Sequence, residues 1–181
     1  MLNKKDAVLV VVDIQDILMP KSVEVVEEYL GRSVKLIRVA RMLEMPVLVT
    51  EQYPERLGST NDRVLDALGD VPRLPKLEFG CLANDAFKAA LEATGRRQLL
   101  LIGMETHVCV NQTALEALEL GYEVYIVRDA IVSGEKAEYK AGLARMKQAG
   151  AVPVTTDMAI FELLRKAGTP EFKAALPLLK N

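Results

Sequence analysis

The chain has 181 residues, 50% of them hydrophobic, which is enough for one globular domain with a complete core. Lysine and arginine number 23 against 25 aspartate and glutamate residues, and the net charge of −2 gives no basic surplus that would indicate nucleic acid or an anionic membrane as a partner. Two cysteines are too few for a disulfide scaffold and suit the reducing cytoplasm, where we expect this protein.

The first half of the chain predicts strands around one long helix. Residues Ala7–Val12 form an apolar, β-branched run that is typical of a strand buried on both faces. That run is too short for the apolar core of a signal peptide, and no later stretch approaches the roughly 18 residues of a membrane helix. Residues 22–43 have apolar side chains at helical spacing, and residues 47–49 indicate a second strand. Residues 51–75 are rich in Pro, Gly, Asn, Asp and Arg and predict mostly loop, with a short strand near residues 73–77.

Strands and helices then alternate to the end of the chain. We expect a helix over residues 84–94, a strand over 98–102, a helix over 107–120, a strand over 123–127, a helix over 136–149, a strand over 152–155 and a helix over 158–167. The tail from Thr169 is expected to be irregular, with at most one helical turn. This alternation predicts a single α/β domain over residues 1–181, in which helices cover both faces of a mostly parallel sheet of about six strands as a three-layer α/β/α sandwich.

Polar residues at the ends of strands are the candidates for chemistry, because ligands of such folds bind where the strand order reverses, beyond the carboxyl ends of the strands. Cys109 follows the strand over residues 98–102. Thr106 is expected to cap the next helix, which places Cys109 in its first turn, where the helix dipole lowers the pKa of a thiol. A buried cysteine that fills a small gap in the core is the ordinary alternative.

Asp13 and Lys76 are the other two candidates. Asp13 ends an apolar strand, where burial of a carboxylate is costly unless it has a partner; a helix cap or a loop hydrogen bond is the alternative. If the strands before Asp13 and Cys109 flank the reversal, the two side chains face one crevice. Lys76 lies between a proline and a glycine in a loop-like stretch, where a solvated surface lysine is the ordinary alternative.

Three motifs resemble those of the isochorismatase-like cysteine hydrolases. They are VVVDIQ at residues 10–15, PKLEFG at residues 75–80 and GMETHVCV at residues 103–110, in the order that the family has. The resemblance covers nearly the whole chain. Within the superfamily it is closest to the isochorismatase-domain-containing proteins of unassigned substrate, which share the TEQYP segment at residues 50–54.

The resemblance implies a catalytic triad of Asp13, Lys76 and Cys109. In this triad Cys109 attacks a carbonyl to form a thioester, Asp13 takes the thiol proton and later gives it to the leaving amine, and Lys76 stabilises the thiolate. The resemblance implies a small-molecule substrate with an amide, ureide or carbamoyl C–N bond. It also implies a Rossmann-like strand order and a homo-oligomeric protein. True isochorismatases typically lack the cysteine, which favours C–N hydrolysis over cleavage of a vinyl ether; the latter is kept as an alternative.

The chain departs from the nicotinamidase branch of the superfamily, whose members bind a metal through histidines in the loop after the second strand. Here that loop reads TEQYPERLGST, and His107 is the single histidine of the chain. A histidine-rich metal site is therefore excluded, and we expect neither a metal nor another cofactor. A magnesium site made of carboxylates alone stays open.

Further residues are candidates for the substrate pocket, with core packing or a solvent-facing position as the alternative for each. They are Gln15, Tyr53, Phe79 and His107, together with Glu51 and Gln52 beside Tyr53. We expect Cys81 to pack in the core or the pocket wall, and Asp129 to be structural. Related hydrolases carry a cis peptide at the bond that matches Met104–Glu105, which implies an oxyanion hole formed by the backbone N–H groups of Glu105 and Cys109.

Two rival interpretations come from other functional classes: a non-catalytic binding or scaffold protein, and a redox-sensing thiol. Labelling by iodoacetamide separates them. Much faster labelling of Cys109 than of Cys81, with a pH midpoint below the free-thiol value of about 8.5, would favour catalysis. Equal, slow labelling of both would favour binding. A Cys81–Cys109 bond that forms under peroxide would favour redox sensing.

Overall fold

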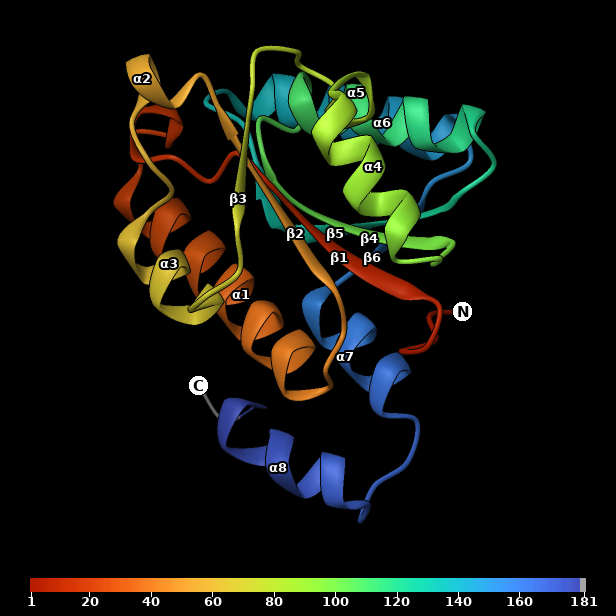
Figure 1. The fold of residues 1–181 in the computed structure, drawn as a ribbon. Helices are drawn as coiled ribbons and strands as arrows, with labels where there is room; N and C mark the ends of the chain where they lie inside the picture. Colours follow the sequence, from red (N-terminus) through yellow and green to blue (C-terminus); the bar gives the residue numbers. More distant parts are fainter. Residues whose placement is uncertain (180–181) are drawn as a thin grey trace.

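The computed structural model describes residues 1–179, and its centre is one sheet of six parallel strands (Figure 1). The strands are β1 (Ala7–Val12), β2 (Val47–Gln52), β3 (Arg73–Lys76), β4 (Gln98–Met104), β5 (Glu123–Val132) and β6 (Val152–Val154). Their order in the sheet is β3-β2-β1-β4-β5-β6, and every neighbouring pair is parallel. The predicted α/β sandwich with Rossmann-like strand order is confirmed.

The strand order reverses between β1 and β4, because the chain goes from β1 to β2 and β3 on one side and then crosses to β4 on the other. Every residue of both central strands is buried. Ala7, Leu9 and Val11 belong to the core cluster on one face of the sheet, whereas Val8, Val10 and Val12 belong to the cluster on the opposite face. Burial on both faces explains why these strands appear in the sequence as continuous apolar runs.

Helices cover both faces of the sheet. They are α1 (Val23–Met42), α2 (Pro54–Leu57), α3 (Asp62–Leu68), α4 (Asp85–Ala93), α5 (Cys109–Glu119), α6 (Lys136–Gln148), α7 (Thr156–Leu164) and α8 (Pro170–Leu179), with two 3₁₀ turns, η1 (Asp16–Leu18) and η2 (Cys81–Ala83). Helices α1, α3, α7 and α8 contribute to the core cluster on one face, and α4, α5 and α6 to the cluster on the other (Figure 1). None of the helices over residues 1–179 has the length and apolar character needed to cross a membrane.

The segment predicted to be mostly loop after β2 contains two helices, α2 and α3. Asn61 caps α3, since its side chain accepts a hydrogen bond from the backbone N–H of Arg63 at 3.0 Å. Val64 and Leu68 are buried on one side of α3, which packs against α1. The helix is short, so its periodicity is hidden among the loop-forming residues that surround it.

The tail from Thr169, predicted to be irregular, forms α8. Pro170 starts the helix, and the Thr169 side chain accepts a hydrogen bond from the backbone N–H of Phe172 at 3.1 Å. Ala175 is buried, and α8 packs against α1. The internal Pro177 makes the segment look unsuited to a helix, but packing against α1 compensates for the loss of a backbone donor.

Strand β5 continues to Val132 instead of ending at residue 127. The charged pair Arg128–Asp129 suggests an end to the strand, but the pairing with β4 shifts register there and resumes at Ile131. Asp129 accepts hydrogen bonds from the backbone N–H and hydroxyl of Thr156, at 2.8 and 3.0 Å, at the start of α7. Asp129 thus joins β5 to α7.

Candidate active site

The candidate residues gather at the carboxyl edge of the sheet, where the strand order reverses. Asp13 directly follows β1, Gln52 and Lys76 end β2 and β3, and Cys109 begins α5, the helix after β4. Since β3, β2, β1 and β4 are neighbours in the sheet, their carboxyl ends bring these side chains together.

Asp13 is fully buried, and both of its carboxylate oxygens are hydrogen-bonded. Oδ1 accepts from the hydroxyl of Thr50, and Oδ2 accepts from Nζ of Lys76, each at 2.7 Å. The backbone of Asp13 has a positive φ of 49°, which turns the chain sharply as it leaves β1. The carboxylate has the charged and hydrogen-bonding partners that burial of an acid requires.

Lys76 is buried, in contrast to the solvated surface lysine that its local sequence would ordinarily suggest. Its ammonium has four acceptors: the Asp13 carboxylate at 2.7 Å, Oε1 of Gln52 at 2.5 Å, and the backbone carbonyls of Glu78 and Phe79 at 3.0 and 3.1 Å. Burial lowers the pKa of Lys76, but its attraction to Asp13 and to the two cysteines outweighs burial and leaves the pKa above its ordinary value. The site therefore holds a fixed positive charge.

Cys109 lies at the start of α5 and is 6% exposed, with its sulfur 3.9 Å from Oε1 of Gln52. Burial is the main reason that the pKa of its thiol rises to about 12; the negative charge of Asp13 adds to the rise, and Lys76 opposes it. The expectation that this thiol has a lowered pKa at the start of the helix is wrong, because burial and the nearby Asp13 carboxylate raise it.

The sequence did not identify Thr50 as part of this cluster. Its hydroxyl donates to Asp13 and lies 3.7 Å from the sulfur of Cys81, which is fully buried in the core as expected. Thr50 pairs with Val12 in the sheet, so it lies beside the residue that precedes Asp13. A threonine in a strand is ordinary, and only this cross-strand register reveals its role.

The prediction that Thr106 caps α5 is wrong. Helix α5 starts later than predicted, at Cys109, with Val108 at the capping position and no side-chain cap. Thr106 instead hydrogen-bonds through its backbone N–H to the carbonyl of Val132, and its buried hydroxyl has no partner within residues 1–179. The Met104–Glu105 peptide is cis, as predicted, and among the described residues the backbone N–H groups of Glu105 and Cys109 have no backbone acceptor.

Gln15 is fully buried and joins the end of β2 to the loop at Gly58 instead of standing free in a pocket. Its amide nitrogen donates to the backbone carbonyls of Gln52 and Gly58, at 2.9 and 2.6 Å, and its Oε1 accepts from the backbone N–H of Gln52 at 2.8 Å. Tyr53 and Phe79 follow β2 and β3 and are 42% and 53% exposed, so these two remain candidates for contact with a substrate.

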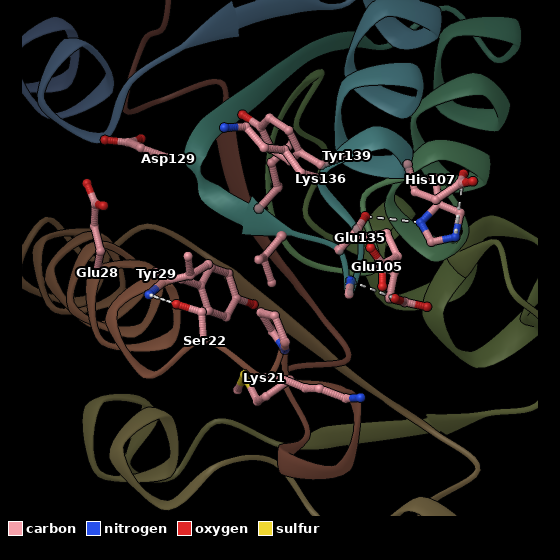
Figure 2. Close-up of a pocket in the computed structure, with 18 of the residues that line it drawn as sticks. Lys21, Ser22, Glu28, Tyr29, Glu105, His107, Asp129, Glu135, Lys136 and Tyr139 are labelled. Atoms are coloured by element: carbon pink, nitrogen blue, oxygen red, sulfur yellow. Dashed lines mark hydrogen bonds and ion pairs between the residues drawn. The ribbon is translucent and has the colours of Figure 1, made fainter.

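A cleft of about 810 Å³ lies between the start of α1 and the loop that joins β5 to α6 (Figure 2). His107 and Glu105 line it, whereas Asp13, Lys76 and Cys109 do not. Nδ1 of His107 lies 3.0 Å from the hydroxyl of Ser133, and the Glu105 carboxylate accepts from the backbone N–H of Gly134 at 3.1 Å. Both side chains thus connect the segment before α5 to the loop after β5.

Residues 1–179 contain no group of three or more His, Cys, Asp and Glu side chains placed to hold a metal ion. Both cysteines are free thiols. The side chains of the cluster offer the thiols of Cys109 and Cys81, one carboxylate and one ammonium, with amide and hydroxyl groups around them.

Comparison with known proteins identifies relatives along nearly the whole chain. The model of the isochorismatase domain matches residues 7–158. The secreted isochorismatase effector Isc1 of Phytophthora sojae is 35% identical over 179 residues, which cover 97% of this chain and 85% of that protein. The isochorismatase domain-containing protein 2 of Xenopus laevis is 32% identical over 172 residues, covering 95% and 82% of the two chains.

Solved structures with the same fold cover the chain equally well. The MAR1 ribonuclease from Caenorhabditis elegans has a TM-score of 0.91 at 30% identity, covering 99% of this chain and 92% of its own. YcaC from Pseudomonas aeruginosa, solved with hexane-2,5-diol and covalent acrylamide, has a TM-score of 0.87 at 28% identity, covering 98% and 90%. YcaC from Escherichia coli, described as an octameric hydrolase of unknown specificity, has a TM-score of 0.86 at 26% identity, covering 98% and 86%.

Proposed function

The chain belongs to the isochorismatase family, and we propose that it is a cysteine-dependent hydrolase that cleaves the C–N bond of a small amide, ureide or carbamoyl compound. One observation carries the proposal. The Asp13 carboxylate is buried between the ammonium of Lys76 and the hydroxyl of Thr50, in the same cluster as the sulfur of Cys109. A carboxylate paired with an ammonium and close to a thiol is a proton acceptor positioned to activate a nucleophile.

The first half of the reaction forms a thioester. The sulfur of Cys109 attacks the carbonyl carbon as its proton passes to Asp13, and the electron pair of the C=O bond moves to the oxygen. The tetrahedral intermediate then collapses: the C=O bond re-forms, the C–N bond breaks, and Asp13 gives its proton to the leaving nitrogen. Lys76 stays protonated throughout and balances the negative charge that moves between sulfur and carboxylate.

The second half releases the acid. Asp13, ionised again, takes a proton from water as the water oxygen attacks the thioester carbon. The C–S bond breaks, and the proton held by Asp13 returns to the sulfur of Cys109. One water is consumed for each C–N bond broken, and the three side chains return to their starting protonation states.

The raised pKa of the Cys109 thiol fits this order of events. With a pKa of about 12, Cys109 carries its proton at neutral pH, so transfer to Asp13 has to accompany the attack. The backbone N–H groups of Glu105 and Cys109 are the proposed donors to the oxyanion, since neither is used by a backbone acceptor among the described residues. The related YcaC from Pseudomonas aeruginosa was solved with covalent acrylamide, and because acrylamide is an electrophile this supports a reactive nucleophile in that relative.

We also propose how the protein is organised around this site. The chain is one domain, residues 1–179 of which share the single sheet and its covering helices. A homo-oligomer is the proposed assembly, since the related YcaC from Escherichia coli is described as octameric. The cytoplasm is the proposed compartment, because both cysteines are free thiols.

The decisive experiment is a hydrolysis screen of small amides, ureides and carbamoyl compounds with the wild-type protein and Cys109→Ala. Release of ammonia or amine by the wild type and its loss in Cys109→Ala are expected, with Cys81→Ala as the matched thiol control. Rapid acid quenching followed by intact-mass measurement should reveal the acyl group on Cys109. A C–N hydrolase activity that survives in Cys109→Ala would exclude the thioester route.

Two further arms of the screen test the rivals. A vinyl ether substrate tests isochorismatase-type cleavage, and RNA tests the activity for which the related MAR1 protein is named. Turnover of either one, with none of any C–N compound, would overturn the proposal. A ligand that raises the melting temperature but is never turned over would support the binding-protein interpretation instead.

A further inference from the structure

Gln52 lies between the thiol and the ammonium of the site, and it has no part in the proton transfers described above. We propose that Gln52 is a positioning residue that keeps Cys109 protonated until substrate binds, by accepting the hydrogen bond of the thiol and by occupying the ammonium of Lys76. The inference rests on the proposed function, since it assigns a regulator to the nucleophile of that reaction. Its argument begins with the orientation of the Gln52 amide.

The contacts of Gln52 fix which end of its amide faces the site. Nε2 donates to the backbone carbonyl of Leu77 at 2.9 Å, so Oε1 points to Lys76 at 2.5 Å and to Cys109 at 3.9 Å. The opposite orientation would place the NH₂ group of Gln52 against the Lys76 ammonium, two donors together. It would also place Oε1 against the Leu77 carbonyl, two acceptors together, and neither contact could be a hydrogen bond. Gln15 holds the Gln52 backbone on both its N–H and its carbonyl.

Lys76 has no proton left for the sulfur in this arrangement. An ammonium has three N–H bonds, and the four acceptors around Nζ already exceed that number. Two of these acceptors, the carbonyls of Glu78 and Phe79, belong to the backbone. The third, the Asp13 carboxylate, is charged and forms an ion pair with the ammonium. Gln52 is therefore the one neutral side chain among the four acceptors, and the one whose oxygen also faces Cys109.

The oxygen of Gln52 favours the thiol over the thiolate. A thiol can donate to Oε1, whereas a thiolate would face the negative end of the amide dipole. The titratable groups around the sulfur are Asp13 at the end of β1, Lys76 at the end of β3 and Cys81 in η2. Asp13 also disfavours a thiolate, Lys76 favours it, and Gln52 weakens that favourable effect by engaging the ammonium.

Activation then involves a change of partner. When the thiol proton moves to Asp13, the sulfur becomes negative and Asp13 becomes neutral, and Lys76 keeps its charge. An N–H of Lys76 that pointed at Gln52 can turn to the sulfur, because the amide is a weaker acceptor than a thiolate. Gln52 thus protects the nucleophile from reaction before substrate arrives, without taking up a proton itself.

The test is the rate at which iodoacetamide alkylates Cys109, measured by mass spectrometry across neutral to alkaline pH in the full-length protein. Gln52→Met removes the acceptor while keeping the length of the side chain, and we expect the midpoint of the pH profile to fall by about one unit, a tenfold gain in thiolate at neutral pH. Gln52→Glu keeps the shape but adds a negative charge, and we expect the midpoint to rise. Gln112→Met, at an exposed position of the same helix as Cys109, is the matched control.

Opposite shifts in the Met and Glu variants support the proposal, because a merely structural role would move both in one direction. Equal shifts, or a Met variant that behaves like Gln112→Met, would overturn it. Slow labelling of the buried Cys81 shows that a variant is folded. If Gln52→Met unfolds the protein and exposes Cys81, Gln52→Asn is the second variant. It moves the amide oxygen back by one methylene, and we expect it to lower the midpoint of the Cys109 pH profile as well. The labelling needs no substrate. A failed hydrolysis screen would therefore count against the proposed function without deciding the role of Gln52.

Discussion

The ammonium of Lys76 lies 2.7 Å from the carboxylate of Asp13, and neither side chain reaches solvent. Removing two charges from water is costly, and their attraction only roughly offsets that cost. The pair is therefore a weak source of net stability, but each member depends on the other. In the proposed reaction the pair has a role of a different kind, since it keeps a proton-accepting carboxylate near the thiol of Cys109.

Lys76→Met should destabilise the protein by about 3–5 kcal/mol, because it leaves the Asp13 carboxylate buried without its counter-charge. Urea denaturation measures the change in the free energy of unfolding. The exposed Lys140 gives a matched control, and Lys140→Met should change stability by no more than about 0.5 kcal/mol. Adding Asp13→Asn to Lys76→Met should restore part of the loss, since the unpaired charge is then gone. Equal stabilities of Lys76→Met and Lys140→Met would contradict the buried pair.

Stability should fall as the pH rises from about 9 toward 12. Burial raises the pKa of Cys81, like that of Cys109, from the ordinary 9.0 to about 12. Between these values the unfolded chain loses thiol protons that the folded protein keeps, so alkaline pH favours unfolding. The contribution is fully present below the unfolded pKa and disappears as the pH rises through the folded one, with a slope of about 1.4 kcal/mol per pH unit for each thiol.

Cys81→Ala isolates one of the two thiols in that pH dependence. The difference in unfolding free energy between wild type and variant should shrink as the pH rises across this window, because only the wild type loses the stability that the protonated Cys81 thiol contributes. Urea denaturation at several alkaline pH values measures it. Other groups whose pKa burial raises, such as Tyr29, are common to both proteins, so their contributions cancel in the difference. A difference that stays constant with pH would mean that the Cys81 thiol ionises in the folded protein as easily as in the unfolded one.

Those elements of the fold that are buried on both faces could be predicted closely from the sequence. β1 has the predicted bounds Ala7–Val12, because a strand covered on both faces has to be apolar at every position. The misjudged elements depend on tertiary contacts. Helix α3 is stabilised by α1, and α8 contains Pro177 and is held by packing against the same helix. In both segments the helical spacing of apolar residues is too weak to be recognised among the loop-forming residues around it.

The site was predictable where a residue type is unusual for its place and less so where it is ordinary. An acid after an apolar strand and a cysteine in the first turn of a helix are unusual, and these signals together with the motifs point to Asp13 and Cys109. Thr50 is an ordinary strand residue, and the cross-strand register Gln52↔Lys76 that brings Oε1 to the ammonium is set by pairing between β2 and β3. Such pairing depends on contacts that are distant in sequence.

Hydrolysis by this protein should survive treatment with EDTA. Residues 1–179 contain no cluster of His, Cys, Asp and Glu side chains suited to a metal, and the reaction proposed for Cys109 supplies its own nucleophile. The measurement compares turnover of a substrate from the screen before and after dialysis against EDTA, with metal content followed by elemental analysis. Loss of turnover that zinc or magnesium restores would contradict the prediction and would make a bound metal part of the reaction.

Two Gly→Ala substitutions should have opposite effects on stability, because the two glycines have opposite surroundings. Gly103 in β4 has a φ of 127°, and a Cβ there would lie 2.0 Å from the carbonyl oxygen of Val12 and 2.8 Å from two further backbone atoms of that residue. Gly31 lies within α1, where an added Cβ would meet nothing within 4 Å. Val12 directly precedes Asp13, so the close approach at Gly103 also sets the separation of β1 and β4 at the edge that holds the site.

Gly103→Ala should therefore destabilise the protein by at least about 3 kcal/mol, the combined cost of backbone strain and of pushing two buried strands apart. Gly31→Ala should stabilise it by about 0.5–1 kcal/mol, because alanine favours the helix and restricts the unfolded chain. Urea denaturation of both variants beside wild type measures the two changes in the free energy of unfolding. Iodoacetamide labelling of Cys109 should change in Gly103→Ala alone, since only that substitution displaces the end of β1. A Gly103→Ala protein as stable as wild type would mean that β4 does not approach β1 as closely as the structure indicates.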